Sequence, residues 1–190
     1  MKRAIAFLQP GWADWELGPV LAGLRFYLQY ETLIASPDGR PVTSMGGVRA
    51  NADLAFATAS LNDRPLLLLI GSEAWSGFRD EGLLALLRQS RDQGWVIGAI
   101  CAGTVAAARA GLLEGRAHTS NGRRWLLEQA PGYAGAEGYR DEKHAVADGQ
   151  LVAAPGSAPN TFAAELFRLA APDRPEVAAG FRAMAAGEWE

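Results

Sequence analysis

The sequence contains very little cysteine and histidine: one cysteine, Cys101, and two histidines, His118 and His144, in 190 residues. A single cysteine cannot form an internal disulfide. We expect neither a metal site nor a bound cofactor. Cysteine chemistry in this chain therefore depends on Cys101 alone.

The sequence also lacks an excess of either charge and any long hydrophobic run. Acidic and basic residues are scattered, with a formal net charge of −3, so neither a basic stripe for nucleic acid nor a polybasic patch for lipid is present. The longest apolar runs, such as 65–71, fall far below the roughly 20 residues that span a bilayer. The apolar stretch near the N-terminus is too short for a signal peptide. We expect a cytoplasmic protein that binds neither nucleic acid nor membrane.

Short apolar runs alternate with helical patterns along the chain. The length and the 49% of hydrophobic residues predict one domain, 1–190. Strand–helix alternation indicates parallel strands joined by right-handed crossovers, with helices on both faces of the sheet. The predicted strands are 3–8, 31–36, 64–72 and 95–100, and the predicted helices are 14–28, 80–94, 102–113, 158–171 and 174–186.

Two segments read as hairpins rather than as strand–helix units. Proline, aspartate and glycine punctuate 37–56, and 144–156 contains an Asp-Gly turn between apolar runs. The helix that follows the second hairpin is predicted to be capped near Asn160 or Thr161.

Cys101 lies where an apolar run, 95–100, changes into a run of small residues. A strand that enters a helix through a tight turn points the turn side chain outward at the carboxyl edge of the sheet. The helix N-terminus would also lower the pKa of a thiol there. A lone cysteine in an apolar run is more often buried and inert, but this context favours a nucleophile.

Three other positions belong to the same edge. Glu16 follows the first strand, where it can hold or move a proton beside the thiol or simply be a solvated first-turn glutamate. Gly71 and Ser72 follow another buried strand, and their backbone N–H groups, with that of Ala102, predict an oxyanion hole, the alternative being a plain turn.

Tryptophans are concentrated in the loops predicted at this edge. Trp12, Trp15 and Trp75 indicate a small apolar pocket, with Asn121 as a further candidate lining residue. Packing or a dimer contact is the alternative for each tryptophan.

Four segments together resemble the PfpI/ThiJ superfamily, often called the DJ-one type, which is related in fold to class I glutamine amidotransferases. The resemblance implies a flavodoxin-like three-layer α/β sandwich with a mostly parallel central sheet and Cys101 on a strand-to-helix nucleophile elbow. It further implies an acidic partner at Glu16, oxyanion donors at Gly71, Ser72 and Ala102, and a homodimer. The segments are 7–20, 66–75, 95–122 and 149–167.

The sequence departs from the superfamily in its histidines. Members with hydrolase or glyoxalase-like activity commonly place a histidine beside the cysteine. His118 is the candidate here, but the usual position is two or three residues later, at Ser120 or Asn121, and an odd offset in a strand reverses the face. His144 is a weaker candidate. The His-x-Glu of amidotransferases is absent near the C-terminal end, so glutamine hydrolysis is not expected.

These features predict a cysteine-dependent enzyme that acts on a small electrophilic molecule. Cys101 is the nucleophile and Glu16 the proton carrier of a hydratase, an amidase-like hydrolase or a glyoxalase-like lyase. Residues 10–19 are similar to the corresponding loop of isocyanide hydratases. Two alternatives stay open: an oxidative-stress sensor or protective protein whose Cys101 becomes a sulfinate, and a ligand-sensing subunit of a regulator.

Overall fold

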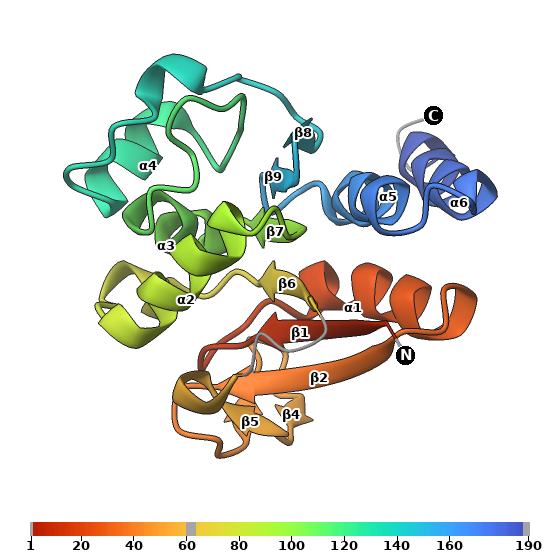
Figure 1. Ribbon diagram of the computed structural model, residues 1–190, viewed down its shortest axis with the longest axis horizontal. Helices are drawn as coiled ribbons and strands as arrows, with labels where there is room; N and C mark the ends of the chain where they lie inside the picture. The colour runs from red at the N-terminus through yellow and green to blue at the C-terminus, as the bar shows by residue number, and fades with distance from the viewer. Residues whose placement is uncertain (1, 60–63, 188–190) are drawn as a thin grey trace.

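The computed structural model describes residues 2–59 and 64–187, and a seven-stranded sheet runs through its centre (Figure 1). The strand order is β5-β2-β1-β6-β7-β9-β8; β8 runs antiparallel to β9, and the other neighbours pair in parallel. The ends of the expected domain, residues 1 and 188–190, lie outside the described residues. The strands are β1 (Arg3–Phe7), β2 (Glu31–Ser36), β5 (Leu54–Ala55), β6 (Leu66–Leu69), β7 (Ile97–Ile100), β8 (Val146–Asp148) and β9 (Leu151–Ala154).

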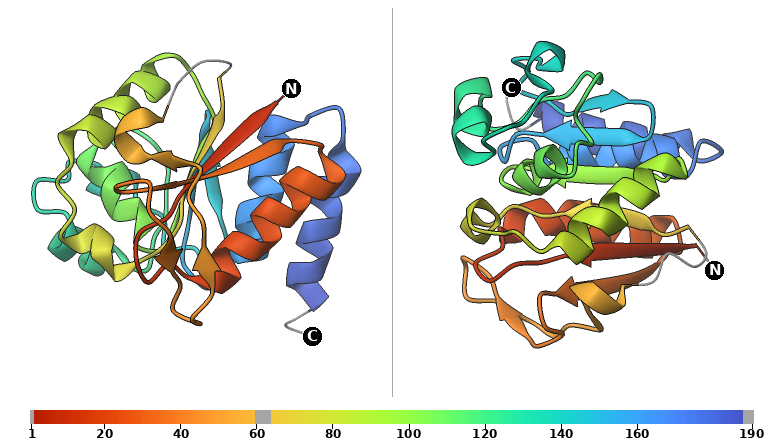
Figure 2. Two further views of the ribbon diagram at one scale, coloured as in Figure 1. Left: turned by 90° about the horizontal axis from the view of Figure 1, so that it is seen from below. Right: turned by 60° about the vertical axis from the view of Figure 1, so that its left-hand side comes forward.

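Helices cover both faces of this sheet, which gives the predicted three-layer α/β sandwich (Figure 2). One face carries α1 (Asp14–Ala22), α5 (Pro159–Ala170) and α6 (Pro175–Gly187). The other carries α2 (Glu81–Asp92) and α3 (Gly103–Arg109), with α4 (Arg123–Gln129) beside α3. Among the described residues, no helix is long and apolar enough to cross a membrane.

The central strands are buried on both faces. Every residue of β6, β7 and β9 is buried, as parallel strands between two helical layers require. The edge strand β8 is half-buried, and the predicted Asp-Gly turn joins it to β9, with Gly149 at a φ of 59°. The apolar runs of the sequence thus become the centre of the sheet.

The first predicted helix, 14–28, forms in two parts. The α-helical part, α1, ends at Ala22, and a π-helical turn, η1 (Gly23–Tyr27), follows it directly. Pro19 lies inside α1, beyond its first turn. A side chain at Gly23 would overlap the ring of Phe167 on α5, so the glycine permits the close packing of these helices.

Segment 37–56 contains the predicted hairpin, but it is short. β3 (Val42–Thr43) and β4 (Arg49–Ala50) pair in antiparallel fashion, whereas β5 joins the edge of the main sheet beside β2. The remaining short elements are the 3₁₀ turns η2 (Phe56–Thr58), η3 (Glu73–Ser76) and η4 (Ala136–Gly138).

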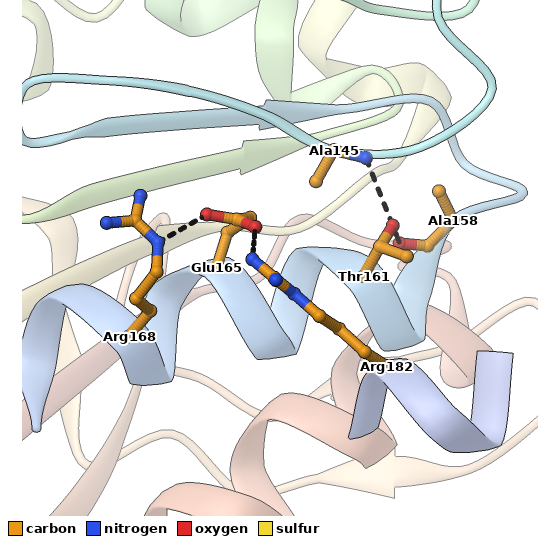
Figure 3. A network of polar contacts seen from close by, with 6 residues as sticks. All are labelled: Ala145, Ala158, Thr161, Glu165, Arg168 and Arg182. Carbon is orange, nitrogen blue, oxygen red and sulfur yellow. Dashed lines mark hydrogen bonds and ion pairs between the residues drawn. The ribbon is translucent and has the colours of Figure 1, made fainter. Parts of the chain in front are cut away.

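Neither Asn160 nor Thr161 caps α5, contrary to prediction. The N-cap residue is Ala158, which makes no side-chain cap, because the helix already begins at Pro159. Thr161 Oγ1 instead accepts a hydrogen bond from the Ala145 N–H at 3.0 Å and so ties α5 to the segment before β8 (Figure 3).

The C-terminal helix α6 packs on α5. Glu165 of α5 accepts from Arg168, at 2.8 Å, and from Arg182 of α6 (Figure 3). The rings of Phe167 and Phe181 meet edge to face at 5.0 Å between centroids. The predicted C-terminal helix therefore covers the outside of α5.

Candidate active site

The carboxyl ends of β1, β6 and β7 lie side by side and bring the predicted site residues together. The chain proceeds from β1 to β2 on one side of β1 and to β6 and β7 on the other, which places a topological switch point at this edge. Glu16 comes from the start of α1, Gly71 follows β6, and Cys101 follows β7. Residues far apart in the sequence thus meet at one point.

Cys101 occupies a strained turn. Its φ is +55°, the left-handed region that costs a non-glycine residue about 1–3 kcal/mol. The turn is held by the Cys101 N–H, which donates to the Ala154 carbonyl at 2.9 Å, and by Thr104 Oγ1, which donates to the Cys101 carbonyl at 2.5 Å. Gly103 follows, and a side chain there would overlap the Leu69 carbonyl oxygen. The strand-to-helix elbow predicted from the sequence is present.

Glu16 is fully buried beside the thiol. Its Oε2 accepts a hydrogen bond from the Gly71 N–H at 2.8 Å. Its Oε1 has no nitrogen or oxygen donor among the described residues and lies next to Cys101. Burial raises the pKa of Glu16 to about 7, although the Gly71 N–H opposes the rise. The carboxyl is therefore poised to gain or lose a proton near neutral pH.

Two glycines leave room for this carboxyl–thiol pair. A Cβ on Gly71 would stand 2.5 Å from Glu16 Oε2. A Cβ on Gly156, after β9, would stand 2.9 Å from Cys101 Sγ and 3.0 Å from Glu16 Oε1. No larger residue fits either position without displacing the pair.

The sulfur of Cys101 receives hydrogen bonds from two N–H donors. Asn121 Nδ2 donates to Sγ at 3.1 Å, while Asn121 Oδ1 accepts from the Gly156 N–H at 2.9 Å, so the amide is oriented at both ends. The Ala102 N–H also donates to the sulfur. Both donors favour the thiolate.

The pKa of the Cys101 thiol is nevertheless raised, to about 11, whereas the sequence led us to expect a lowered value. Burial is the main cause and the negative charge of Glu16 the second. The helix behind Cys101, α3, has only seven residues, and its N-terminus does not outweigh these effects. Between pH 7 and 11, Glu16 and Cys101 accordingly hold one proton between them.

His118 does not serve the thiol, which corrects its place among the candidates. Nδ1 pairs with the Arg116 carbonyl at 2.7 Å and Nε2 with the Tyr133 hydroxyl, so both ring nitrogens are engaged elsewhere. The side chain is completely buried. His118 forms an isolated β-bridge with Tyr139, and Asn121, three residues later, is the side chain that reaches the sulfur. His144 lies at the surface, 3.6 Å from Glu142.

The predicted oxyanion donors are only partly available. The Gly71 N–H is committed to Glu16. The Ser72 N–H donates to no acceptor in the described part of the chain, and the Ser72 hydroxyl donates to the Pro10 carbonyl at 2.6 Å. Ser72 and Ala102, with the amide of Asn121, are therefore the donors beside the reacting sulfur.

An open pocket of about 440 Å³ leads to Cys101. Its walls come from the β3–β4 loop, from η3 and from α4. Uncharged side chains dominate the lining, and Glu73 supplies its one ionic side chain. The lining residues are Met45, Ser72, Glu73, Ser76, Cys101, Ala102, Asn121, Trp125 and Gln129.

None of the three predicted pocket tryptophans lines this pocket. Trp75 is fully buried, stacks on Phe56 and donates through Nε1 to the Ile70 carbonyl at 2.7 Å. Trp12 is buried in the core on the other face of the sheet. Trp15 is half-exposed and donates to the Gly156 carbonyl at 2.9 Å, so it supports the site from outside. The pocket tryptophan is Trp125, on a helix that the sequence did not predict.

Comparison with known proteins agrees with this fold. Residues 2–169 match the DJ-1/PfpI family. The chain belongs to that family. This confirms the resemblance to the PfpI/ThiJ superfamily expected from the four sequence segments.

Several known proteins resemble the chain over most of its length. The DJ-1 superfamily protein Atu0886 from Agrobacterium tumefaciens is 35% identical, with a TM-score of 0.90 over 99% of this chain and 100% of that one. The thiJ/pfpI family protein from Bacillus anthracis is 31% identical, with a TM-score of 0.82 over 88% of this chain and 82% of that one. A Bacillus subtilis protein named uncharacterized protease YoaZ is 30% identical over 82% of this chain and 77% of its own length.

Proposed function

We propose that this DJ-1/PfpI family protein is a cysteine-dependent enzyme that acts on a small electrophilic molecule. The observation that supports this best is the buried carboxyl of Glu16. Gly71 holds one of its oxygens, and the other lies beside a thiol that opens onto a pocket. Because an amide cannot accept a proton at neutral pH, Asn121 cannot act as the base, and the proton carrier is Glu16.

The first chemical step is addition of the sulfur to a carbon–heteroatom multiple bond. Ionised Glu16 accepts the thiol proton, and an electron pair on Sγ forms a bond to the electrophilic carbon. The π electron pair of the substrate moves onto its heteroatom, where the Ser72 N–H and the Asn121 amide donate hydrogen bonds. Glu16 then returns the proton to that atom or, in an isocyanide, to the carbon that now carries the sulfur. A hydratase, an amidase-like hydrolase and a glyoxalase-like lyase all share this step.

The lining of the pocket favours an uncharged substrate. Met45 and Trp125 supply apolar surface, Ser76 and Gln129 supply neutral hydrogen-bonding groups, and Glu73 adds a negative charge. An anionic electrophile would meet no cationic side chain in this lining. The name of the Bacillus subtilis relative, a protease, supports hydrolysis as one outcome.

The experiment that tests the proposal is the pH dependence of Cys101 alkylation by iodoacetamide in the wild type and in Glu16→Gln. The wild-type rate should rise with an apparent pKa near 7, as Glu16 becomes able to share the thiol proton. In the variant, the rise in alkylation rate near pH 7 should be absent, and the rate should follow a single ionisation at higher pH. Identical profiles in the two proteins would remove Glu16 from the mechanism.

An assay of substrate turnover completes the test of the proposed enzyme. Isocyanides and glyoxals should be screened as substrates, with Cys101→Ser as the matched variant. Turnover that disappears in this variant supports the enzyme, and turnover that persists excludes Cys101 as the nucleophile.

One observation favours the sensor as a second candidate. The Ala102 N–H, the Asn121 amide and a protonated Glu16 together surround Sγ with donors that suit the oxygens of a sulfinate. Mild peroxide should then add two oxygen atoms to Cys101, as measured by intact-protein mass, and Glu16→Gln should reduce that yield. A third oxygen formed equally in both proteins would contradict the sensor.

A further inference from the structure

Arg109, the last residue of α3, makes an unusual set of contacts. Its guanidinium donates to four backbone carbonyls: those of Trp75 at 2.5 Å, Ser76 at 2.7 Å, Phe78 at 2.9 Å and Gln129 at 2.6 Å. It forms no ion pair among the described residues. The guanidinium therefore binds backbone dipoles in place of a carboxylate.

Three of these carbonyls belong to η3 and α4, which are two of the three segments that form the walls of the Cys101 pocket, and the fourth, that of Phe78, lies two residues after η3. Trp75 and Ser76 end the 3₁₀ turn η3, which contributes Glu73 and Ser76 to the lining. Gln129 ends α4, and this helix contributes Trp125 and Gln129. A cation at the end of a helical segment is favourable because the last carbonyls have no intrahelical partner.

The helix that carries Arg109 begins just after the reactive cysteine. Cys101 lies two residues before Gly103, the first residue of α3, and Arg109 is the last residue of the helix. One short helix therefore links the cysteine at one end with η3 and α4 at the other.

We propose that Arg109 is a positioning residue that fixes the width of the Cys101 pocket by holding η3 and α4 against α3. The inference rests on the proposed function only in taking this pocket as the substrate site. Arg109 does not line the pocket and takes no part in the chemistry.

Only an arginine can make this set of contacts. Its planar guanidinium presents five N–H donors in a fixed geometry, whereas a lysine presents one compact ammonium group. Arg109→Lys keeps the charge but cannot span carbonyls on two segments. Arg79 is a matched control because its guanidinium donates to the Ser76 and Phe78 carbonyls, at 3.0 and 2.8 Å, without reaching α4.

The test compares alkylation of Cys101 by a bulky reagent, pyrene maleimide, and by a small one, iodoacetamide. The ratio of the two rate constants should rise at least about threefold in Arg109→Lys and Arg109→Gln, and stay at the wild-type value in Arg79→Gln. The pH profile with iodoacetamide should be the same in all four proteins, because the surroundings of the sulfur are unchanged. An unchanged ratio, or an equal rise in Arg79→Gln, overturns the proposal.

Hydrogen exchange keeps the proposal testable if Arg109→Gln fails to fold. In Arg109→Lys, exchange should quicken in 73–78 and 123–130 and stay at the wild-type rate in 97–103. Faster exchange across the whole chain would mean that Arg109 serves general stability, which overturns a specific role at the pocket. Because neither measurement requires turnover, failure of this inference is distinguishable from failure of the proposed function.

Discussion

Asn121 stands beside the thiol where a histidine is common in the superfamily. An amide can donate to the sulfur and orient itself on the Gly156 N–H, but it cannot carry a proton in the neutral range. Among the described residues beside the sulfur, Glu16 is therefore the group that can exchange a proton with Cys101. Addition chemistry, in which one proton moves away and returns, suits such a pair.

A prediction at this scale concerns the charge of the electrophile. Iodoacetate and iodoacetamide are similar in size, but only iodoacetate is anionic. Glu73→Gln should raise the rate of Cys101 alkylation by iodoacetate about two- to fivefold relative to iodoacetamide, as expected for one partly screened charge in the pocket wall. Glu114→Gln, outside the pocket lining, is the control. Equal ratios in the wild type and Glu73→Gln would contradict charge selection by the pocket.

The same residues show what the sequence can and cannot predict about the site. Cys101 and Glu16 are predictable because each lies in the segment that leads from an apolar strand into the next helix, and parallel strands bring their carboxyl ends to one edge. Trp125 is not, because no pattern indicates that α4 reaches back to the elbow. The commitment of the Gly71 N–H to Glu16 is equally hidden, because it depends on where a buried side chain from another strand unit points.

At the scale of elements, the close contact between β7 and α5 fixes the strand that precedes Cys101. A Cβ on Gly98 would stand 2.8 Å from the ring of Phe162 and 3.0 Å from the methyl groups of Leu166. The small residue in the middle of β7 thus allows α5 to lie close to the sheet. The apolar pattern of the sequence predicts the strand but not the short distance between β7 and α5.

Gly98→Ala should destabilise the fold by about 1–3 kcal/mol, because the added methyl group overpacks the interface between β7 and α5. Gly180→Ala in α6 is the matched control. Its Cβ would meet nothing within 4 Å, and the substitution should stabilise by about 0.4–1 kcal/mol. Urea unfolding of both variants measures the difference. Loss of stability in Gly180→Ala, or none in Gly98→Ala, would contradict this account of the packing.

Element positions follow from the sequence more closely than element ends do. The predicted strand 31–36 is observed with the same bounds, and the long first helix is found, although its last turn is π-helical. Helix ends depend on contacts that no local pattern encodes. The N-cap of α5 at Ala158 and the tie between Thr161 and Ala145 are examples.

For the whole molecule, the buried carboxyl couples stability to pH. The pKa of Glu16 is raised from 4.5 to about 7 in the folded state. Between these values the folded protein binds more protons than the unfolded chain, so its stability falls as pH rises. This one group should lower the free energy of unfolding by about 3 kcal/mol between pH 4 and pH 8.

Glu16→Gln should not show this fall in the free energy of unfolding as pH rises. Relative to the wild type, the variant should gain about 3 kcal/mol in unfolding free energy between pH 4 and pH 8, because its amide does not ionise. Urea denaturation of both proteins at the two pH values measures the difference. Parallel pH dependence in the two proteins would show that Glu16 has an ordinary pKa.

The expected homodimer stays a prediction, to be tested by light scattering.

The glycines that enclose the sulfur also govern how this protein can be redesigned. Gly71 and Gly156 touch the carboxyl–thiol pair so closely that libraries of substitutions there should return inactive proteins. New specificity is instead accessible at the rim, where Met45, Trp125 and Gln129 line open space. Directed evolution for another substrate should therefore gather its changes on the β3–β4 loop and α4 while the elbow stays fixed.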